Sequence, residues 1–232
     1  MDSTSEDDLQ GDRQLDRQRD PFEAQREEMV RSQLAQRGIR DHRVLDAMRY
    51  VPRHEFVPEL LRQDAYEDRP LPIGDGQTIS QPYIVATMLE HLALEATERV
   101  LEIGTGSGYV TALLSLLVAE VYSVERHARL AASAKNALHG LDYRNAHIRV
   151  GDGSQGWIEH APFDAILVSA ATAEMPPALL AQLREGGRMI VPIGPSTSQN
   201  LQLIRKTGGE PEVNILEGCR FVPLVSGTMN GG

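Results

Sequence analysis

The residues best suited to chemistry are three carboxylates placed in or just after short apolar runs. They are Glu102 within Val100–Ile103, Glu125 after Val121–Val124, and Asp152 after His147–Val150. A glycine-rich segment, 104–108, follows the first run, and glycine lets a ligand approach the main chain closely. Parallel strands end at one edge of a sheet, so these groups are predicted to meet around a single ligand.

The spacing of the glycines indicates which ligand this is. A dinucleotide fingerprint needs G-x-G-x-x-G, whereas this chain has G-x-G-x-G with Tyr109 in the place of the last glycine. An acid two residues before the first glycine favours S-adenosylmethionine, whose amino group and sulfonium need carboxylate and carbonyl neighbours. Glu125 is predicted to accept the ribose hydroxyls and Asp152 the adenine amino group. The predicted cofactor-binding residues are Glu102, Gly104, Thr105, Gly106, Ser107, Gly108, Glu125, Asp152 and Gly153.

S-adenosylmethionine donates methyl groups, and motifs missing from the sequence narrow the class of group that could accept one. The segment after the fourth predicted strand, 169–172, has neither the acceptor oxygen nor the aromatic face that amino methylation of a DNA base requires. No histidine, lysine or metal site stands out that could help to remove a proton from an acceptor. His54 lies between prolines and is expected to be structural. A carboxylate acceptor, with a reference pKa near ~4, is already ionised and needs no base.

A segment rich in proline and glycine, Pro72–Pro82, offers groups to bind such a carboxylate. Thr78 and Ser80 lie two residues apart, so they share one side of an extended strand. Ser80 also precedes a predicted helix, where it could either bind the acceptor or only cap the helix. The spacing alone supports both interpretations equally.

The elements that must position these groups follow an alternating pattern. Apolar runs of strand length alternate with segments of helical periodicity from residue 83 onward, which predicts an α/β fold with an open, mostly parallel sheet covered by helices on both faces. The strand runs are 100–103, 121–124, 147–150, 165–168 and 189–193, and the helical segments are 83–92, 109–117, 128–138 and 176–183. The last two runs, 201–205 and 213–224, lack a helix between them and predict an antiparallel pair at the sheet edge. Helices are also predicted at 20–38 and 41–48, followed by an irregular stretch at 64–82.

Length and composition indicate one domain. The chain has 232 residues and a formal net charge of −10, which argues against a nucleic-acid partner. Residues 1–20 are predicted to form a disordered acidic arm, and 227–232 a flexible tail. The single cysteine, Cys219, favours a reducing cytoplasm without a disulfide or metal cluster. The longest apolar run, 110–118, is far shorter than a ~20-residue membrane span, so we expect a cytoplasmic protein.

The chain resembles the protein-L-isoaspartate O-methyltransferase family. The matching stretches are 51–58, 72–82, 100–109, 151–157, 163–166, 183–192 and 220–224, and the Gly-Gln-Thr-Ile-Ser-Gln-Pro sequence at 76–82 is the most specific of them. The resemblance implies a Rossmann-like, seven-stranded class I methyltransferase sheet with N-terminal helices in a single domain, 21–232, made of the helices and active-site loop (21–82) and the cofactor-binding sheet (83–226).

The resemblance also implies an activity and a site. The family methylates the free α-carboxylate of L-isoaspartyl residues in damaged proteins and peptides, with S-adenosylmethionine as donor and S-adenosylhomocysteine as product, and thereby initiates repair. Its active-site serine corresponds to Ser80, with Thr78 beside it. Ile79, Gln81, Val222 and Pro223 are expected to bind the substrate peptide.

Three alternatives stay open at this level. The chain could methylate an aspartate in one dedicated modified peptide, or it could be a regulatory module that binds S-adenosylmethionine without turnover and uses its acidic arm for interaction. A dehydrogenase is disfavoured by Tyr109. We expect a monomer whose partners are isoaspartyl proteins and peptides, with no nucleic acid, membrane or metal.

Overall fold

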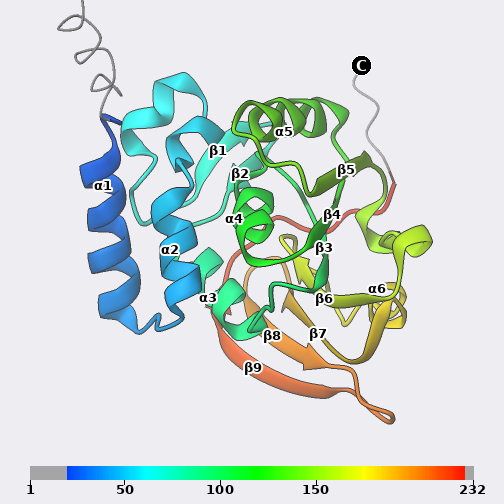
Figure 1. Cartoon of the computed structure of the whole chain (residues 1–232). Coiled ribbons are helices and arrows are strands. Elements are labelled where there is room, and N and C mark those ends of the chain that lie inside the picture. Colours follow the sequence, from blue (N-terminus) through cyan, green and yellow to red (C-terminus); the bar gives the residue numbers. More distant parts are fainter. Residues whose placement is uncertain (1–19, 228–232) are drawn as a thin grey trace, which may run out of the picture.

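The computed structural model describes residues 20–227 and is built around one seven-stranded sheet (Figure 1). Its strands are β3 (Arg99–Ile103), β4 (Glu120–Glu125), β5 (Ala146–Val150), β6 (Phe163–Val168), β7 (Leu183–Ile193), β8 (Gln199–Arg205) and β9 (Glu212–Cys219). They lie in the order β5-β4-β3-β6-β7-β8-β9. The first five are parallel, β8 runs antiparallel to β7, and β9 antiparallel to β8. The predicted fold class and the antiparallel closing pair are therefore confirmed.

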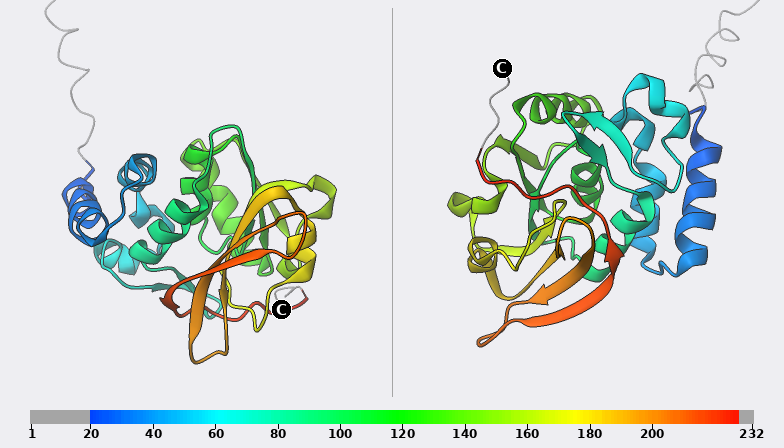
Figure 2. Two further views of the ribbon diagram at one scale, coloured as in Figure 1. Left: turned by 90° about the horizontal axis from the view of Figure 1, so that it is seen from below. Right: turned by 180° about the vertical axis from the view of Figure 1, so that it is seen from behind.

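Alternate strand residues divide the core into two parts, one on each face of the sheet. Val100 and Val121 pack with the N-terminal helices and with α3 (Pro82–Leu92) and α4 (Tyr109–Leu117). Leu101 and Val124 pack on the opposite face with residues of α6 (Pro177–Ala181). A further helix, α5 (Ala128–Gly140), contacts β4 and β5. Both faces are covered, as Figure 2 shows, which explains why most residues of the central strands are apolar.

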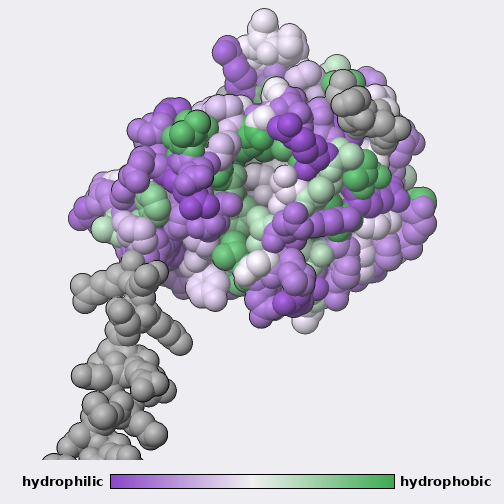
Figure 3. All heavy atoms as spheres, turned by 90° about the horizontal axis from the view of Figure 1, so that it is seen from above, coloured by the Kyte–Doolittle hydropathy of each residue, from purple (hydrophilic) through white to green (hydrophobic). Residues whose placement is uncertain are grey.

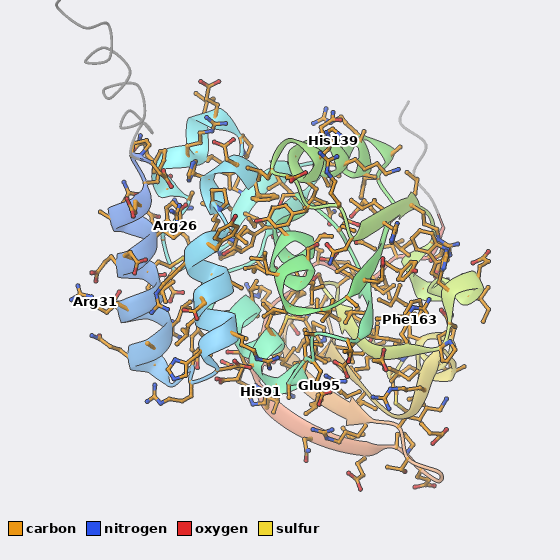
Figure 4. All side chains as sticks on the ribbon, in the orientation of Figure 1. Arg26, Arg31, His91, Glu95, His139 and Phe163 are labelled. Atoms are coloured by element: carbon orange, nitrogen blue, oxygen red, sulfur yellow. The ribbon has the colours of Figure 1, made fainter. Side chains whose placement is uncertain are left out.

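The N-terminal segment forms a separate helical layer beside the sheet (Figures 1 and 2). Its elements are α1 (Glu23–Glu28), a π-helical stretch Met29–Leu34, a short 3-10 turn Ala35–Arg37, α2 (His42–Tyr50) and the 3-10 turns Arg53–Phe56 and Glu59–Asp64. Asp20 accepts a hydrogen bond from the Phe22 N–H at 2.9 Å and pairs with Arg26, but the residue at the cap position of α1 is Phe22, so α1 begins later than the predicted residue 20. Arg26 points to the inner side of α1, and Arg31 points outward from the π-helical stretch that follows it (Figure 4).

The structure corrects three sequence predictions. The stretch 64–82 is not wholly irregular, because β1 (Leu71–Gly74) and β2 (Gln77–Ile79) form an antiparallel hairpin in it. The helix predicted at 176–183 is shorter, since the chain already pairs with β6 at Leu183. The final strand ends at Cys219 instead of residue 224.

Residues 220–224 leave the sheet edge because their main chain finds other partners. The Phe221 N–H donates to Gln199 Oε1 at 2.9 Å, and the Ala171 N–H donates to the Val222 carbonyl at 2.8 Å. The Leu224 N–H then donates to the Ala171 carbonyl at 2.7 Å. The segment therefore crosses the loop after β6, as the red ribbon in Figure 2 shows.

Parts of the predicted domain layout lie outside the described residues. Of the acidic arm only Asp20 is described, and of the tail only Gly227. Within 20–227, no helix is long and apolar enough to cross a membrane. The same residues contain no group of three or more histidine, cysteine or carboxylate side chains placed to hold a metal ion.

Candidate active site

A cavity opens at the carboxyl ends of the parallel strands, beside the point where the strand order reverses between β3 and β6. Its empty space, part of it open to solvent, is about 730 Å³. The surface on this side is hollowed, with apolar and weakly polar residues between hydrophilic rims (Figure 3). We call the cavity at the carboxyl ends of the strands the cofactor cavity. Its walls come from β2, the glycine loop at 104–107, the end of β4, the loop after β6 and residues 222–225.

The glycine loop turns the chain from β3 into α4 through conformations that favour glycine. Gly106 has a φ of +54° and Gly108 a φ of +91°. A Cβ on Gly108 would lie 3.1 Å from the Cβ of Ala134, so glycine also allows α4 and α5 to approach. Of the predicted loop residues, Gly104, Thr105, Gly106 and Ser107 line the cavity, while Gly108 supports them from behind.

Glu125 ends β4 at the wall of this cavity. Its Oε2 accepts the Gly106 N–H and its Oε1 the His127 N–H, both at 2.9 Å. The carboxylate therefore holds the glycine loop, and each oxygen keeps further acceptor capacity for a hydroxyl of a ligand. The side chain is placed as the prediction for ribose binding requires, although that contact itself stays a prediction.

Glu102, like Gly108 and Asp152, does not line the cofactor cavity. It is completely buried, and its Oε2 accepts hydrogen bonds from the hydroxyls of Thr111 and Ser123, both at 2.6 Å. The Ser123 hydroxyl in turn lies 2.5 Å from Thr105 Oγ1 in the glycine loop. Burial raises the pKa of Glu102 to about 7. The structure thus places Glu102 under the loop, where it can act on a cofactor only through Thr105.

Asp152 and Gly153 occupy different positions. Gly153 lines the cavity, and a Cβ there would lie 2.6 Å from Ile103 Cγ2. Asp152 accepts the Ser154 N–H with Oδ1 at 2.9 Å and the Gly227 N–H with Oδ2 at 2.7 Å. Partial burial acts to raise the pKa of Asp152, but these hydrogen bonds outweigh it and the net pKa is lowered. Its oxygens already have protein partners, and the predicted contact with adenine stays a prediction.

The two predicted hydroxyl residues lie where the cofactor cavity meets a second one. This acceptor cleft is bordered by the start of α3, the loop 197–199 and residues 218–222. Thr78, Ser80, Ser169 and Val222 line both cavities. The alternative that Ser80 caps α3 is wrong, because the residue at the cap position is Gln81 and the helix has no side-chain cap. Ser80 also lies just beyond β2, so only Thr78 of the pair is within the strand.

The predicted substrate-binding residues divide between the cavities. Ile79 and Pro223 line the cofactor cavity, Gln81 lines the acceptor cleft, and Val222 lines both. Gln81 also donates from Nε2 to the Asp68 carbonyl at 3.1 Å, which fixes its side chain. The four residues therefore surround the junction of the two cavities, and their contact with a peptide stays a prediction.

Sequence reasoning missed several residues of the site. Ser169 follows β6 and reaches the junction, and the available signal was its place after the fourth strand run. Arg126 lines the cofactor cavity next to Glu125. The fully buried Arg53 binds the main chain of Ser80, a contact for which the sequence contains no signal because the acceptor is a carbonyl group.

The cavity fits S-adenosylmethionine on three observations. Its apolar walls include Ile103 and Val124, which suit a purine ring and a thioether chain. A strand-end carboxylate, Glu125, faces the same space as the glycine loop. Gly153 lines the same space, and a Cβ there would lie 2.6 Å from Ile103 Cγ2, so this part of the wall accepts only glycine. These residues would hold the adenosine part of S-adenosylmethionine, and this part needs no positively charged side chain.

The sheet and this site together define a Rossmann-like class I methyltransferase. The family model of protein-L-isoaspartate(D-aspartate) O-methyltransferase (PCMT) matches residues 24–229, and the chain belongs to this family.

Individual relatives agree with that assignment. A protein-L-isoaspartate O-methyltransferase of Koribacter versatilis is 53% identical over 204 residues, which is 88% of this chain and 92% of the relative. A solved structure of a protein-L-isoaspartate O-methyltransferase superposes with a TM-score of 0.76 at 33% identity, covering 89% of this chain and 66% of the other. A structure described as PCMT from Plasmodium falciparum, in complex with S-adenosyl-L-homocysteine, gives a TM-score of 0.75 at 28% identity, covering 86% of this chain and 98% of the other.

Proposed function

We propose that this protein transfers a methyl group from S-adenosyl-L-methionine to the free α-carboxylate of L-isoaspartyl residues in proteins and peptides, and so initiates their repair to aspartate. The observation that carries the proposal is the junction of the two cavities at Thr78, Ser80, Ser169 and Val222. A donor in one cavity and an acceptor in the other can meet only there. Family membership supports the choice of reaction.

We assign the holding of the donor to four parts of the chain, in the cofactor cavity or, for Asp152, beside it. Glu125 accepts the ribose hydroxyls, the glycine loop 104–108 faces the methionine part, Gly153 leaves room beside the purine, and Asp152 stands at the adenine end. S-adenosylmethionine supplies an electrophilic methyl group on a positively charged sulfur when it is bound. Glu102 acts indirectly, by fixing Thr105 through Ser123.

Ser80 directs the acceptor and does not deprotonate it. An acceptor carboxylate is ionised at neutral pH, and among the described residues that line the two cavities there is no histidine or lysine to serve as a base. The Ser80 hydroxyl donates a hydrogen bond to one carboxylate oxygen, which leaves the other free to attack. A neutral donor suits this task, because a cation would stabilise the nucleophile too strongly. Thr78 lies beside it and confines the same group.

Exclusion of water from the junction is the main contribution of the walls. Opposite charges disappear as the acceptor attacks, and a dry, low-dielectric site favours such a step over the same step in water. Residues 222–225 cover one side of the cofactor cavity and the β1–β2 hairpin the other. Holding the reacting groups at near-attack distance can supply ~7 kcal/mol or more.

The test compares an isoaspartyl peptide with its normal aspartyl twin, using cofactor labelled at the methyl group. Label is expected in the isoaspartyl peptide alone. Equal labelling of both peptides would contradict specificity for isoaspartate, and label only in one dedicated aspartyl peptide would favour the alternative carboxyl methyltransferase. S-adenosylhomocysteine binding without any transfer would favour the regulatory module.

The setting of this activity is part of the same proposal. We infer a monomer that acts in the cytoplasm on isoaspartyl proteins and peptides and does not bind nucleic acid. The supporting features are the net charge of −10 and a single, half-buried cysteine. Sedimentation of the purified protein tests the monomeric state directly.

A further inference from the structure

Arg53 is a fully buried cation placed directly behind the residue that we assign to the acceptor. It opens the 3-10 turn Arg53–Phe56 and has no exposed surface. Its Nε donates to the Ala65 carbonyl at 2.7 Å and its Nη2 to the Ser80 carbonyl at 2.9 Å. The guanidinium carbon lies 4.9 Å from the ring centroid of Tyr109, which lines the cofactor cavity.

This arrangement is costly for the folded protein. Burying a guanidinium removes its hydration, and among the described residues no carboxylate forms an ion pair with Arg53. Its Nη1 is buried and has no hydrogen-bond partner in the same part of the chain. An apolar side chain would fill the space without this penalty, so a purely space-filling role does not explain an arginine here.

The guanidinium of Arg53 can fix the relative position of two main-chain carbonyl groups, which a flexible side chain cannot do. Its donors lie in a rigid plane, so binding two carbonyl groups at once sets the distance and the direction between them. The carbonyls belong to segments 15 residues apart in sequence, after the 3-10 turn Glu59–Asp64 and after β2. Ser80 has no regular ladder partner, because β2 ends at Ile79 and α3 begins at Pro82. Arg53 therefore supports the main chain of Ser80, which belongs neither to the strand nor to the helix.

We infer that Arg53 is a positioning residue for methyl transfer, which orients the Ser80 hydroxyl by holding the Ser80 carbonyl. This inference rests on the proposed function, in which Ser80 contacts the acceptor carboxylate. Arg53 acts through Ser80, and S-adenosylhomocysteine affinity does not depend on it.

The test is a double-mutant cycle with R53K, S80A and R53K/S80A, assayed on the isoaspartyl peptide. Lysine keeps the charge but cannot reproduce the planar fork. We expect R53K to lower kcat roughly tenfold with S-adenosylhomocysteine affinity unchanged within about threefold, and to add less than about threefold in the S80A background. The inference would be overturned if R53K lowered kcat by the same factor in the wild-type and S80A backgrounds. It would also be overturned if R53K weakened S-adenosylhomocysteine binding by the same factor as it lowered kcat.

Arg188 provides the matched control. It is also buried, and it donates to the Leu92 and Ala93 carbonyls and pairs with Glu98, away from both cavities. R188K is therefore expected to lower thermal stability while leaving kcat unchanged. If R53K behaves like R188K, Arg53 is only a core residue and the inference is wrong. If neither R53K nor R53Q folds well enough to bind S-adenosylhomocysteine, the inference is overturned as well.

A second measurement is independent of activity. Amide hydrogen exchange of the peptide that covers residues 77–81 is expected to quicken at least about fivefold in R53K and to stay unchanged in R188K. An unchanged rate in R53K would overturn the inference. If the wild type failed to methylate any isoaspartyl peptide while this exchange still quickened, the proposed function would fail but the positioning of Ser80 by Arg53 would stand.

Discussion

The hydroxyl of Ser123 donates to Glu102 at 2.6 Å in the centre of the sheet, where both side chains are completely buried. The same hydroxyl lies 2.5 Å from Thr105 Oγ1, so the glycine loop is connected to a buried carboxyl group through one oxygen atom. Glu102 Oε1 has no hydrogen-bond partner among the described residues. The ionisation of Glu102 is therefore linked both to the stability of the sheet and to the position of the loop.

Replacing Glu102 by glutamine should change how stability depends on pH. Because burial raises the pKa of Glu102 from 4.5 to about 7, the folded protein binds more protons than the unfolded chain between these values, and stability falls as pH rises through that window. Glu102→Gln removes the dependence. We expect the difference in unfolding free energy, variant minus wild type, to be about 3 kcal/mol larger at pH 8 than at pH 4. Urea unfolding at both pH values measures it. Glu120→Gln, at a partly exposed position, is the control, and a Glu102→Gln difference that does not vary with pH would contradict the assignment.

Replacing Ser80 by alanine should reduce turnover and spare cofactor binding. The hydroxyl is assigned to one oxygen of the acceptor, so its loss removes a neutral hydrogen bond and the orientation it gives. We expect kcat on an isoaspartyl peptide to fall about tenfold or more, with S-adenosylhomocysteine affinity unchanged within a few-fold. Steady-state kinetics and calorimetry measure the two quantities. Ser32→Ala, on the N-terminal helix, is the control. Weaker affinity with normal turnover would show that Ser80 serves the cofactor instead.

Replacing Glu125 by alanine should have the opposite effect. The variant loses the predicted contact with the ribose hydroxyls and releases the Gly106 N–H that the carboxylate binds at 2.9 Å. Hydrogen bonds to charged groups contribute roughly 1.5–3 kcal/mol, so S-adenosylhomocysteine affinity is expected to fall about 10-fold to 150-fold in calorimetric titration. Glu120→Ala, at the other end of β4, should leave affinity unchanged. Retention of wild-type affinity in Glu125→Ala would remove this residue from the cofactor site.

Adding a methyl group at Gly153 should narrow the cofactor cavity. The new Cβ would lie 2.6 Å from Ile103 Cγ2, so Ile103 or the segment after β5 has to shift. We expect Gly153→Ala to weaken S-adenosylhomocysteine binding about tenfold or more, because the side chain or main chain displaced by overpacking takes up space in the cavity. Gly208→Ala is the matched control, because its Cβ would meet no atom within 4 Å. Equal affinities of the two variants would show that the wall near Gly153 is not part of the binding surface.

Much of the sheet could be predicted from the sequence, because buried parallel strands are continuous apolar runs and the glycine loop marks the first turn. The hairpin β1–β2 could not, since Pro72 and Gly74 are typical of irregular structure and the pairing shifts register between them. The path of residues 220–224 depends on main-chain hydrogen bonds with Ala171, and main-chain partners have no sequence pattern.

The same distinction applies to the site. Glu102 and Glu125 carry the same side chain near a strand end, but Glu125 is the last residue of β4 and Glu102 the last but one of β3. One residue of difference places Glu125 at the cavity and leaves Glu102 enclosed by Ser123 and Thr111. Arg53 could not be assigned in advance, because its two acceptors are carbonyl groups of distant segments.

At the proposed junction, the shared lining of the two cavities by Ser80 and Val222 would restrict which damaged sites can react. A carboxylate held within a helix or a paired strand of its own protein cannot enter a junction of this kind without first separating from its neighbours. Modification of folded targets should therefore proceed at a rate set by how often each damaged segment opens. An enzyme built in this way would sort ageing proteins by their local stability, repairing loops and loosened ends long before a damaged residue in a rigid interior.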